Sequence, residues 1–572
     1  MMLETTLTTE FRPGTNVKGE ITAANWIFLL PSLELNRILC LGNPNSAALR
    51  TLSRIGRTVC VQCETTRQLQ RVSEAIGKYG LENVQTYMRE AESFMDAAQG
   101  IADLVFLSGW KTTHRIIRDA NLRQQALKLL APGGFLYFEF AGFLDKISGG
   151  QLMRQSGKNG RDFNLYWLTP LKGETQTAVL AADRKTVRYL YGHHLYSPTF
   201  PFLKLPKVER MMGQSATLKE YTQRYGVLAG QLSGISKNCP PQYLISIASS
   251  SGVDLSSYRW ALSARGRFNS RKVLFFLFEE EKEKPEFIVK IVRDPALNYR
   301  LESEWKALSA IQGTRLPELG SFPHPVFYGY HAGVAVLGET ILAGVPFKQK
   351  SRDPFDSPYG PKAVEWLTKL AECTVQKTVV SPAQVASGLE QLFEQFAAIY
   401  TVEPRYLDFL AGQIKRIRQF SGLFSTVFQH GDPGTWNAII TPEDEVTFLD
   451  WEAAEPQGIP LWDLFYFLRS YTMGAAPRLR HYDRIEAFRR QFIDNPSLAS
   501  MVMRSVEQYC RRIDLSGELI EPLFYTCWMH RSLKQATLLP KHKLSRGHYL
   551  NLLQLCIDLR ENPTFEHLFE IR

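Results

Sequence analysis

The sequence predicts two folded parts, an α/β part with a largely parallel sheet and an α+β part with two lobes. Strands alternate with helical segments over residues 1–140, which is the pattern of a doubly wound parallel sheet. Further along, an apolar strand at 287–292 carries Lys290 in its middle, and a strand, a polar turn and a second strand follow at 438–449. The 572-residue chain has room for both parts, because a domain commonly holds about 100–200 residues.

Each element of the first part follows from a short apolar run or from helical periodicity between Gly and Pro signals. The predicted strands are 37–42, 58–61, 102–107, 135–138, 167–170 and 177–180, and the predicted helices are 46–55, 65–79 and 122–130. The last helix ends at a Leu-Ala-Pro-Gly-Gly run at 130–134, since Pro and Gly stop helices.

This order, with Leu-Ala-Pro-Gly-Gly before a late strand, resembles the class I S-adenosylmethionine-dependent methyltransferases. The resemblance implies a Rossmann-like fold and a glycine turn after the first strand that approaches S-adenosylmethionine. The turn here reads Gly-Asn-Pro-Asn from Gly42 to Asn45, and Gln62 or Glu64 are the candidates for an acid that holds the ribose. A working methyltransferase and a structural, regulatory or substrate-docking part both remain open.

In the second part, the run from His430 to Asn437 reads His-Gly-Asp-Pro-Gly-Thr-Trp-Asn, and the second strand ends in Leu-Asp-Trp-Glu at 449–452. If the strands pair antiparallel, Asn437 and Asp450 lie side by side. Amide and carboxylate oxygens suit Mg²⁺, and Asp432 on its Gly- and Pro-bearing loop could accept a proton from a hydroxyl. The alternative is a polar turn whose Asp and Asn cap local backbone.

This pattern resembles the aminoglycoside phosphotransferase and choline kinase family, small-molecule kinases with a bilobal protein-kinase-like fold that use ATP and Mg²⁺. The resemblance implies that Asp432 is the catalytic base, that Asn437 and Asp450 are metal ligands, and that His430 holds the loop. Glu452 is a further candidate ligand of the metal.

Lys290 lies within an apolar strand, and Lys is rarely buried unless it is paired. The helical pattern at 300–308 offers Glu304 as a partner, with Glu302 as the competing choice. The resemblance implies that Lys290 contacts the α- and β-phosphates and that Glu304 holds it. Alternatively, the stem of Lys290 extends out of an edge strand into solvent.

Other binding positions of the small lobe follow from the same resemblance. Gly266 would permit a hairpin turn, followed by a predicted strand at 272–278, to approach the phosphates. The backbone near Glu339 and Ile341, in the predicted connector between lobes at 334–344, would face the adenine edge. Asp463 would steady the catalytic loop. The predicted domains are a methyltransferase-like domain at 1–235, a kinase small lobe at 236–345, and a large lobe with a helical acceptor region at 346–572.

Composition fits a soluble cytoplasmic protein, with 44% hydrophobic and 22% charged residues and neither a leader pattern nor an apolar run long enough to span a membrane. The eight cysteines are scattered, as expected of buried thiols in a reducing compartment. Cys60 and Cys63 lie in a predicted buried strand and lack a second pair nearby that would complete a zinc site.

Most of the net charge of +10 comes from residues 144–225, which contain thirteen Lys and Arg but six Asp and Glu. A basic surface formed by this segment could attract a phosphate-bearing glycan or an acidic lipid surface, or it could simply be solvated. No nucleic-acid motif is present, so nucleic acid is not an expected partner. The sequence leaves the oligomeric state open.

The last hundred residues are predicted to be helical and to build the acceptor pocket. They contain five cations without an intervening acid: Arg531, Lys534, Lys541, Lys543 and Arg546. Like charges would repel a polycationic acceptor, so we expect a neutral or anionic one.

The preferred interpretation is an ATP-dependent phosphotransferase acting on a hydroxyl of a small molecule, sugar, glycan or lipid head group. One alternative is a bifunctional methyltransferase-kinase that modifies a glycan end, similar to the fusions that cap bacterial O-antigen chains. Another is a catalytically inactive scaffold of two enzyme-like domains.

Overall fold

The computed structural model describes residues 25–30, 32–88, 100–141, 163–170, 177–181, 186, 224–230, 239–263, 272–312, 322–351, 357–377, 380–475, 484–537, 539 and 541–571. These fall into two compact units. The sheet unit comprises the described residues of 17–301 and 325–341, and the helical unit those of 302–324 and 342–571. Because Gly266 and most of 144–225 lie outside the described residues, the predictions made for them are not tested.

The sheet unit is built on one sheet whose strand order is β12-β13-β11-β10-β9-β7-β6-β8-β5-β4-β1-β2-β3. The strands are β1 (Leu35–Gly42), β2 (Gly56–Cys63), β3 (Val84–Met88), β4 (Ala102–Ser108), β5 (Leu130–Ala141), β6 (Phe163–Pro170), β7 (Thr177–Ala181), β8 (Arg224–Gly230), β9 (Arg259–Ser263), β10 (Lys272–Phe278), β11 (Phe287–Val292), β12 (Pro325–His331) and β13 (Val334–Thr340). Its helices are η2 (Asn25–Leu29), α2 (Ser46–Ile55), α3 (Thr66–Tyr79), α5 (Trp110–Arg118), α6 (Ala120–Lys128), α11 (Gln242–Ser249), η5 (Pro295–Leu297) and the start of α12 (Asn298–Gln312).

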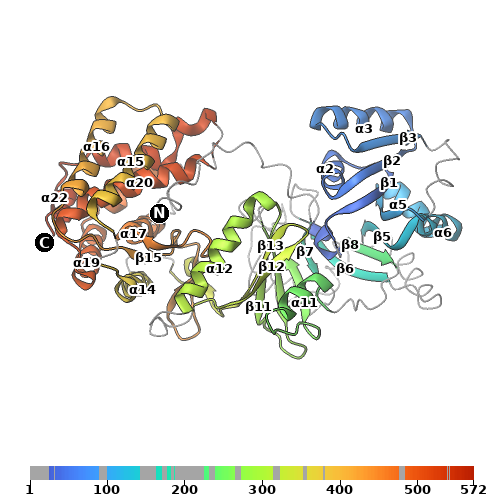
Figure 1. Ribbon diagram of the computed structural model, residues 1–572, viewed down its shortest axis with the longest axis horizontal. Coiled ribbons are helices and arrows are strands. Elements are labelled where there is room, and N and C mark those ends of the chain that lie inside the picture. The colour runs from blue at the N-terminus through green and yellow to red at the C-terminus, as the bar shows by residue number, and fades with distance from the viewer. Residues whose placement is uncertain are drawn as a thin grey trace. The chain divides into compact units, whose positions relative to one another are not determined.

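Five strands of this sheet, β5-β4-β1-β2-β3, are parallel, which confirms a mixed α/β architecture with a Rossmann-like parallel sheet. The chain reverses its direction of winding between β1 and β4, the place where such sheets bind ligands. Helix α2 is capped by Asn45, whose side chain accepts from the amide of Ala48 at 2.8 Å. In Figure 1, α3 runs beside β2 and β3.

The remaining strands pair antiparallel, with β9, β10, β11, β13 and β12 consecutive along one side of the sheet. Strand β10 has the predicted bounds, whereas the predicted connector at 334–344 is largely strand β13, buried between β11 and β12. Burial on both faces explains its apolar run.

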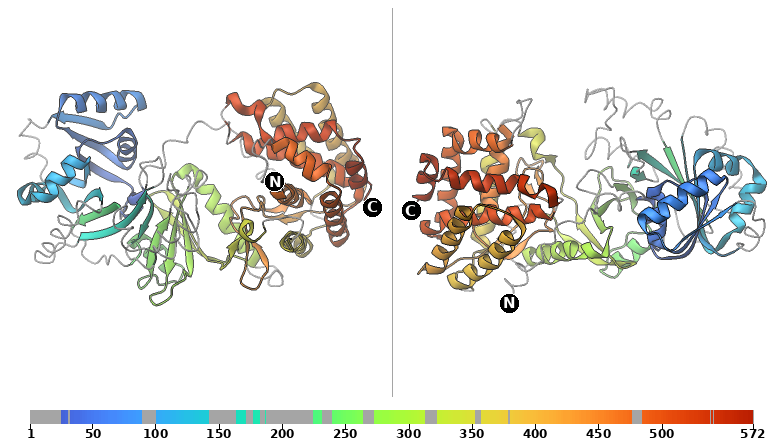
Figure 2. Two further views of the ribbon diagram at one scale, coloured as in Figure 1. Left: turned by 180° about the vertical axis from the view of Figure 1, so that it is seen from behind. Right: turned by 90° about the horizontal axis from the view of Figure 1, so that it is seen from above.

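The helical unit contains short strand pairs and a bundle of helices. Its strands are β14 (Val345–Pro346), β15 (Val427–Gln429), β16 (Ala438–Ile440), β17 (Val446–Phe448) and β18 (Glu455–Gly458). Its helices are α13 (Phe347–Lys350), α14 (Tyr359–Thr374), α15 (Pro382–Ile399), α16 (Pro404–Gln419), α17 (Trp462–Thr472), η7 (Met473–Ala475), α18 (Arg484–Phe488), η8 (Arg489–Ile493), α19 (Pro496–Ile513), η9 (Gly517–Leu519), α20 (Ile520–Ala536), η10 (Lys541–Arg546), α21 (His548–Asp558) and α22 (Pro563–Phe569). Helices α15, α16 and α20 pack side by side (Figures 1 and 2).

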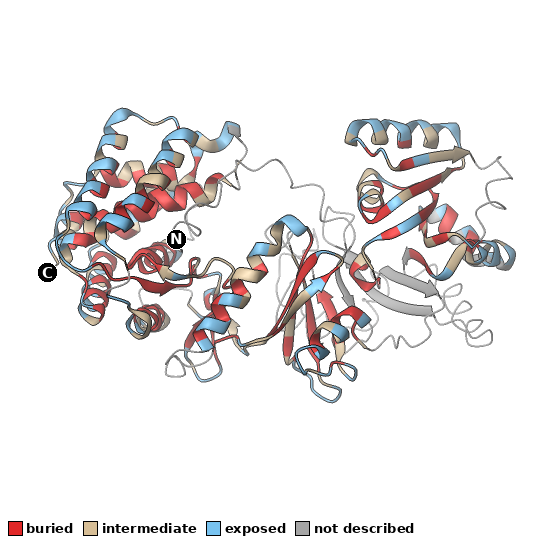
Figure 3. Cartoon of the chain, viewed as in Figure 1, coloured by how far each residue is buried: buried red, intermediate tan, exposed pale blue. Residues whose placement is uncertain are grey.

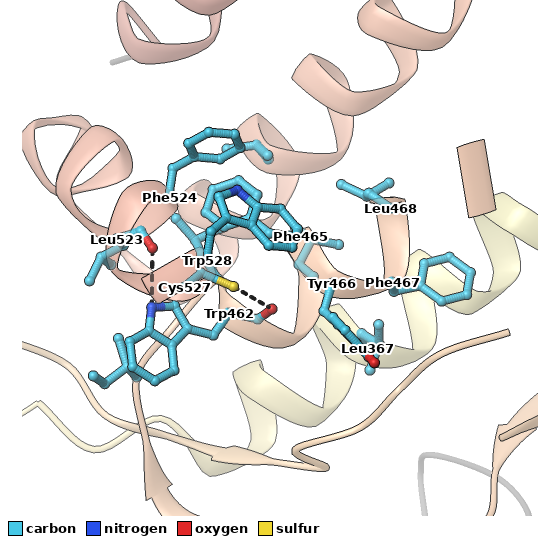
Figure 4. Packing of buried hydrophobic residues seen from close by; sticks show 14 of the residues in the cluster. Leu367, Trp462, Phe465, Tyr466, Phe467, Leu468, Leu523, Phe524, Cys527 and Trp528 are labelled. Carbon is cyan, nitrogen blue, oxygen red and sulfur yellow. Dashed lines mark hydrogen bonds between the residues drawn. The ribbon is translucent and has the colours of Figure 1, made fainter. Parts of the chain in front are cut away.

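The core of the helical unit is formed where α17 packs on α20, and Figure 3 shows both as nearly continuous buried ribbon. The indole of Trp462 donates to the carbonyl of Leu523 at 3.1 Å, and the thiol of Cys527 lies 3.6 Å from the carbonyl oxygen of Trp462 (Figure 4). This contact fixes the position of two charged side chains, Asp463 on α17 and Arg531 on α20. Every helix in the described part of the chain is too short or too polar to cross a membrane.

Candidate active site

The predicted hairpin is present in the helical unit. Strands β16 and β17 pair antiparallel with Ala438 opposite Phe448, and the amide of Leu449 donates to the carbonyl of Asn437 at 2.8 Å. Asp450 follows directly and has a φ of 70°. Residues other than Gly, Asn and Asp rarely adopt a backbone conformation with positive φ, and this conformation often occurs at functional sites. Asn437 and Asp450 therefore lie together at the open end of the hairpin.

The side chain of Asn437 is oriented by Asp432. Its Nδ2 donates to the backbone oxygen of Asp432 at 2.9 Å and to Asp432 Oδ2 at 3.0 Å. The indole N–H of Trp436 donates to the same carboxylate oxygen at 3.4 Å. With its nitrogen used in this way, Asn437 has its oxygen Oδ1 as the atom that would coordinate a cation, and this orientation fits a Mg²⁺ ligand.

The loop that carries Asp432 is held from both sides. The carboxylate of Asp463 accepts from the amide of His430 at 2.6 Å and from the amide of Gly431 at 3.2 Å. His430 Nε2 lies 3.0 Å from the carbonyl oxygen of Leu449, and His430 Nδ1 accepts from the amide of Asp432 at 3.3 Å. This pattern requires the tautomer with the proton on Nε2. The predicted structural roles of His430 and Asp463 are confirmed.

Arg531 completes this support, although its place in the sequence had indicated only a basic tail. Its Nη1 donates to the carbonyl of Gly431 at 2.9 Å, and its Nη2 lies 3.8 Å from Asp463 Oδ1. The guanidinium carbon is 3.5 Å from the centroid of the Tyr466 ring, a cation–π contact. Gly431 has a φ of 77°, and a Cβ there would lie 1.8 Å from the carbonyl oxygen of Ala453. Only glycine fits that turn.

Burial changes the acidity of both carboxyl groups. It raises the pKa of Asp432, an effect that Arg531 and the hydrogen bonds from Tyr466 and Trp436 oppose. Burial likewise raises the pKa of Asp463 to about 6, again opposed by Arg531. A base with a raised pKa is a stronger proton acceptor near neutral pH.

In the sheet unit, Lys290 on β11 is buried, and its Nζ lies 2.7 Å from Glu339 Oε1 on the neighbouring strand β13. This side-chain pairing was not predicted, because Glu339 had been assigned only a backbone role at the adenine edge. The amide of Ile341 donates to the carbonyl of Glu286 at 2.9 Å. A nucleotide could therefore donate a hydrogen bond to the carbonyl of Ile341. To accept one from the N–H of Ile341, it would have to break the bond between that N–H and the carbonyl of Glu286.

The structure distinguishes the two candidate acids on α12. Glu302 forms an exposed pair with Lys306 at 2.7 Å, whereas Glu304 is fully buried and accepts from the amide of Trp451 at 2.9 Å. Lys290 and Glu304 belong to different units, so their pairing stays a prediction. Within the helical unit, Glu304 holds the chain directly after Asp450.

We expect Glu304→Ala to lower the free energy of unfolding by about 1–3 kcal/mol, because the buried N–H of Trp451 loses its acceptor. Glu302→Ala removes only an exposed pair and should change stability by less than about 0.5 kcal/mol. Chemical denaturation of the two variants measures the difference. Equal losses would show that Glu304 does not hold the Trp451 backbone.

The described residues contain no cluster of three or more His, Cys, Asp and Glu side chains arranged to hold a metal. At the hairpin, Asn437 and Asp450 offer oxygen atoms of the kind that Mg²⁺ prefers, and their role as its ligands stays a prediction. Glu452 is half-buried in the turn after Trp451, and its role as a ligand stays a prediction.

A second candidate site lies at the carboxyl edge of the parallel strands. Gly42 ends β1 with a φ of 106°, and a Cβ there would lie 2.1 Å from the carbonyl oxygen of Ser108 on β4. Glu64 directly follows β2, where a ribose-binding acid is expected, and its Oε1 lies 2.5 Å from Arg115 on α5. Glu64 thus occupies the position expected of a ribose-binding acid, but its carboxylate already forms an ion pair with Arg115.

The thiols of Cys60 and Cys63 are buried in β2, and burial raises the pKa of both. Their burial in the core of the sheet unit agrees with the prediction that they lie in a buried strand.

No model of a known family matches the chain, and no curated protein does. Among solved structures, the bifunctional kinase-methyltransferase WbdD is 11% identical, covering 88% of this chain and 89% of that chain at a TM-score of 0.25. A glucosamine kinase in complex with glucosamine, ADP and inorganic phosphate is 13% identical, covering 56% and 84% at 0.33. Precorrin-6y C5,15-methyltransferase from Geobacter metallireducens is 12% identical, covering 34% and 80% at 0.20. Likeness at this level is loose, and the functional conclusions rest on the geometry of the site.

Proposed function

We propose that this protein is an ATP- and Mg²⁺-dependent phosphotransferase with a protein-kinase-like catalytic part, acting on a hydroxyl of a small molecule, sugar, glycan or lipid head group. The observation that carries the proposal is the carboxylate of Asp432, held 3.0 Å from Asn437 Nδ2 at the open end of a hairpin that also carries Asp450. A base beside two oxygen ligands is the arrangement that phosphoryl transfer to a hydroxyl needs.

Each residue has a distinct task in this proposal. Asn437 Oδ1 and Asp450 would hold Mg²⁺, and Mg²⁺-ATP would supply the phosphoryl group. Asp432 orients the acceptor hydroxyl and takes its proton at Oδ1 or Oδ2. The supports from Asp463 and Arg531 keep that carboxylate in one position, so little reorganisation is needed during the reaction. Lys290 is the candidate for the α- and β-phosphates.

The proposal is tested by incubating the full chain with ATP, Mg²⁺ and an extract of metabolites and glycans, and by searching for products that have gained the mass of a phosphate group. Asp450→Asn is the control for metal dependence and should abolish the gain. A catalytically inactive scaffold would give no phosphorylated product and no ATP turnover with any fraction of the extract.

The pH dependence of kcat should report the raised pKa of Asp432. Because burial favours its protonated form, the carboxylate becomes competent only above that raised pKa, and kcat should fall as pH drops through it. We expect the acid limb of the kcat profile to lie clearly above pH 3.8, the ordinary value for this group. An acid limb at or below that value would mean that Asp432 is not the titrating base.

A second candidate function is a bifunctional methyltransferase-kinase, favoured by the position of Glu64 at the carboxyl edge of the parallel strands. The ion pair with Arg115 competes with a ribose for Glu64. Breaking an exposed pair of this kind is worth about 0.2–1 kcal/mol. Arg115→Gln should thus bind S-adenosylmethionine up to about fivefold more tightly than the wild type, and Glu64→Gln should bind it more weakly. Calorimetric titration measures both, and no heat with either wild type or Arg115→Gln would exclude this function.

A further inference from the structure

Outside the basic run between Arg531 and Arg546, three further cations lie around the aromatic side chains that adjoin Asp432. The Nζ of Lys348, on α13, is 5.6 Å from the centroid of the Trp436 ring, whose indole donates to Asp432. Arg469, on α17, lies with its guanidinium carbon 5.2 Å from the Tyr549 ring centroid. Arg484, at the start of α18, influences the charge state of Lys348 and is the third.

Aromatic side chains connect these cations to the base. The ring centroids of Trp436 and Tyr466 are 5.8 Å apart, and the hydroxyls of Tyr466 and Tyr549 are 3.3 Å apart. Tyr466 also forms a hydrogen bond to Asp432. These contacts form a continuous series of side chains that leads from Asp432 through the aromatic rings to Lys348 on one side and to Arg469 on the other.

The three charges are not neutralised by the described residues. Among these, no carboxylate forms an ion pair with Lys348, Arg469 or Arg484, although Arg469 is only 7% exposed. Burial and the two arginines lower the pKa of Lys348, and the same influences lower the pKa of His548 to about 3. His548, a neighbour of Arg469, is thus neutral at pH 7 and adds no further positive charge to this group. Lys348 and Arg484 are exposed, whereas Arg469 is buried, and a buried cation without a counter-charge is costly to maintain.

Lys534, on the other side of Asp432, contrasts with this group. Its Nζ lies 3.9 Å from Glu455 Oε1, so its charge has a partner within the protein. By contrast, Lys348, Arg469 and Arg484 form no ion pair with any carboxylate in the described part of the chain. Trp436, at 48% exposed, is a large apolar side chain in contact with solvent beside them. An exposed aromatic ring between a base and such cations is typical of a ligand site.

We propose that the phosphoryl acceptor carries an anionic group, phosphate or carboxylate, which binds to Lys348 and Arg469 while the acceptor hydroxyl lies at Asp432. This inference rests on the proposed function and narrows its substrate class from neutral or anionic to anionic. The Trp436 ring forms the surface between the two ends of the acceptor. The same cations exclude polycationic acceptors by repulsion.

The first arm of the test sorts acceptors by charge. An extract of metabolites and glycans is separated at pH 7 on an anion exchanger, and the retained and unretained fractions are each incubated with the full chain, ATP and Mg²⁺. The gain of phosphate mass should occur in the retained fraction. A gain confined to the unretained fraction would overturn the anionic class and leave the kinase function intact.

The second arm does not depend on turnover. Inorganic phosphate is titrated into the protein labelled with ¹⁵N in its indoles, and the Trp436 signal, assigned with Trp436→Phe, is followed by NMR. Lys348→Gln should weaken phosphate binding at least about tenfold, the size expected for one charge-assisted contact. Lys543→Gln, an exposed cation on η10, is the matched control and should change nothing. Arg469→Gln should act like Lys348→Gln if it folds.

Affinity for a non-hydrolysable ATP analogue is measured on the same variants. Unchanged nucleotide affinity with weakened phosphate binding supports an acceptor subsite. Nucleotide affinity that falls in parallel would assign the cations to the triphosphate and overturn the proposal, as would phosphate binding that Lys348→Gln leaves unchanged. Phosphate binding at Lys348 without transfer to any fraction would contradict the proposed function but not the anion subsite.

Discussion

Asp432→Asn is expected to lower kcat by about 10²–10⁴-fold, the contribution of a positioned general base. The substituted amide keeps an oxygen that can accept from Asn437 Nδ2 and from the Trp436 indole, so the loop should keep its shape. What is lost is the capacity to take the proton of the acceptor. Affinity for an ATP analogue with Mg²⁺ should stay within about threefold of the wild-type value, a change of less than about 0.7 kcal/mol in binding free energy.

Steady-state turnover and analogue binding on the same preparation separate these two effects. Asp408→Asn, the same chemical change at an exposed position of α16, is the matched control and should leave both quantities unchanged. An Asp432→Asn variant that retains more than about a tenth of wild-type kcat would remove Asp432 from proton transfer. A variant that loses nucleotide binding as well would point to a structural role for the carboxylate.

The elements that sequence alone predicted are those fixed by local interactions. The β16–β17 hairpin depends on a short polar turn in which Asp444 takes a φ of 64°, and its register follows once the turn is set. Helix α2 and strand β10 were also predicted with their observed bounds, because a capping Asn45 and an uninterrupted apolar run mark them. The juxtaposition of Asn437 and Asp450 came with the hairpin.

The features that sequence could not predict depend on residues far apart in the chain. Arg531 lies 100 positions from the Gly431 carbonyl that it binds, and nothing near Arg531 in the sequence distinguishes it from the other basic residues of its region. Similarly, Glu339 meets Lys290 only because β11 and β13 are neighbours in the sheet. Strand β3 and helix α5 were missed because their apolar runs are short, and packing on the sheet overrides their weak local signals.

Arg531→Met should be strongly destabilising. The guanidinium of Arg531 is buried, donates to the Gly431 carbonyl and lies 3.8 Å from Asp463. Removing one partner of a buried charged network costs about 3–5 kcal/mol, because the remaining charge is left uncompensated. The same substitution removes the charge that opposes the effect of burial on Asp432, so the pKa of Asp432 should rise further and kcat at neutral pH should fall.

Arg531→Lys separates the charge from the shape of the guanidinium. A lysine keeps the positive charge but cannot make the planar contact with the Tyr466 ring or donate in the same forked geometry. We expect it to recover part of the stability lost in Arg531→Met and to return the acid limb of the kcat profile towards that of the wild type. Thermal unfolding and the pH profile of each variant measure these two effects. If Arg531→Met kept wild-type stability and an unshifted acid limb, the catalytic loop would have to be positioned by Asp463 and His430 without this arginine.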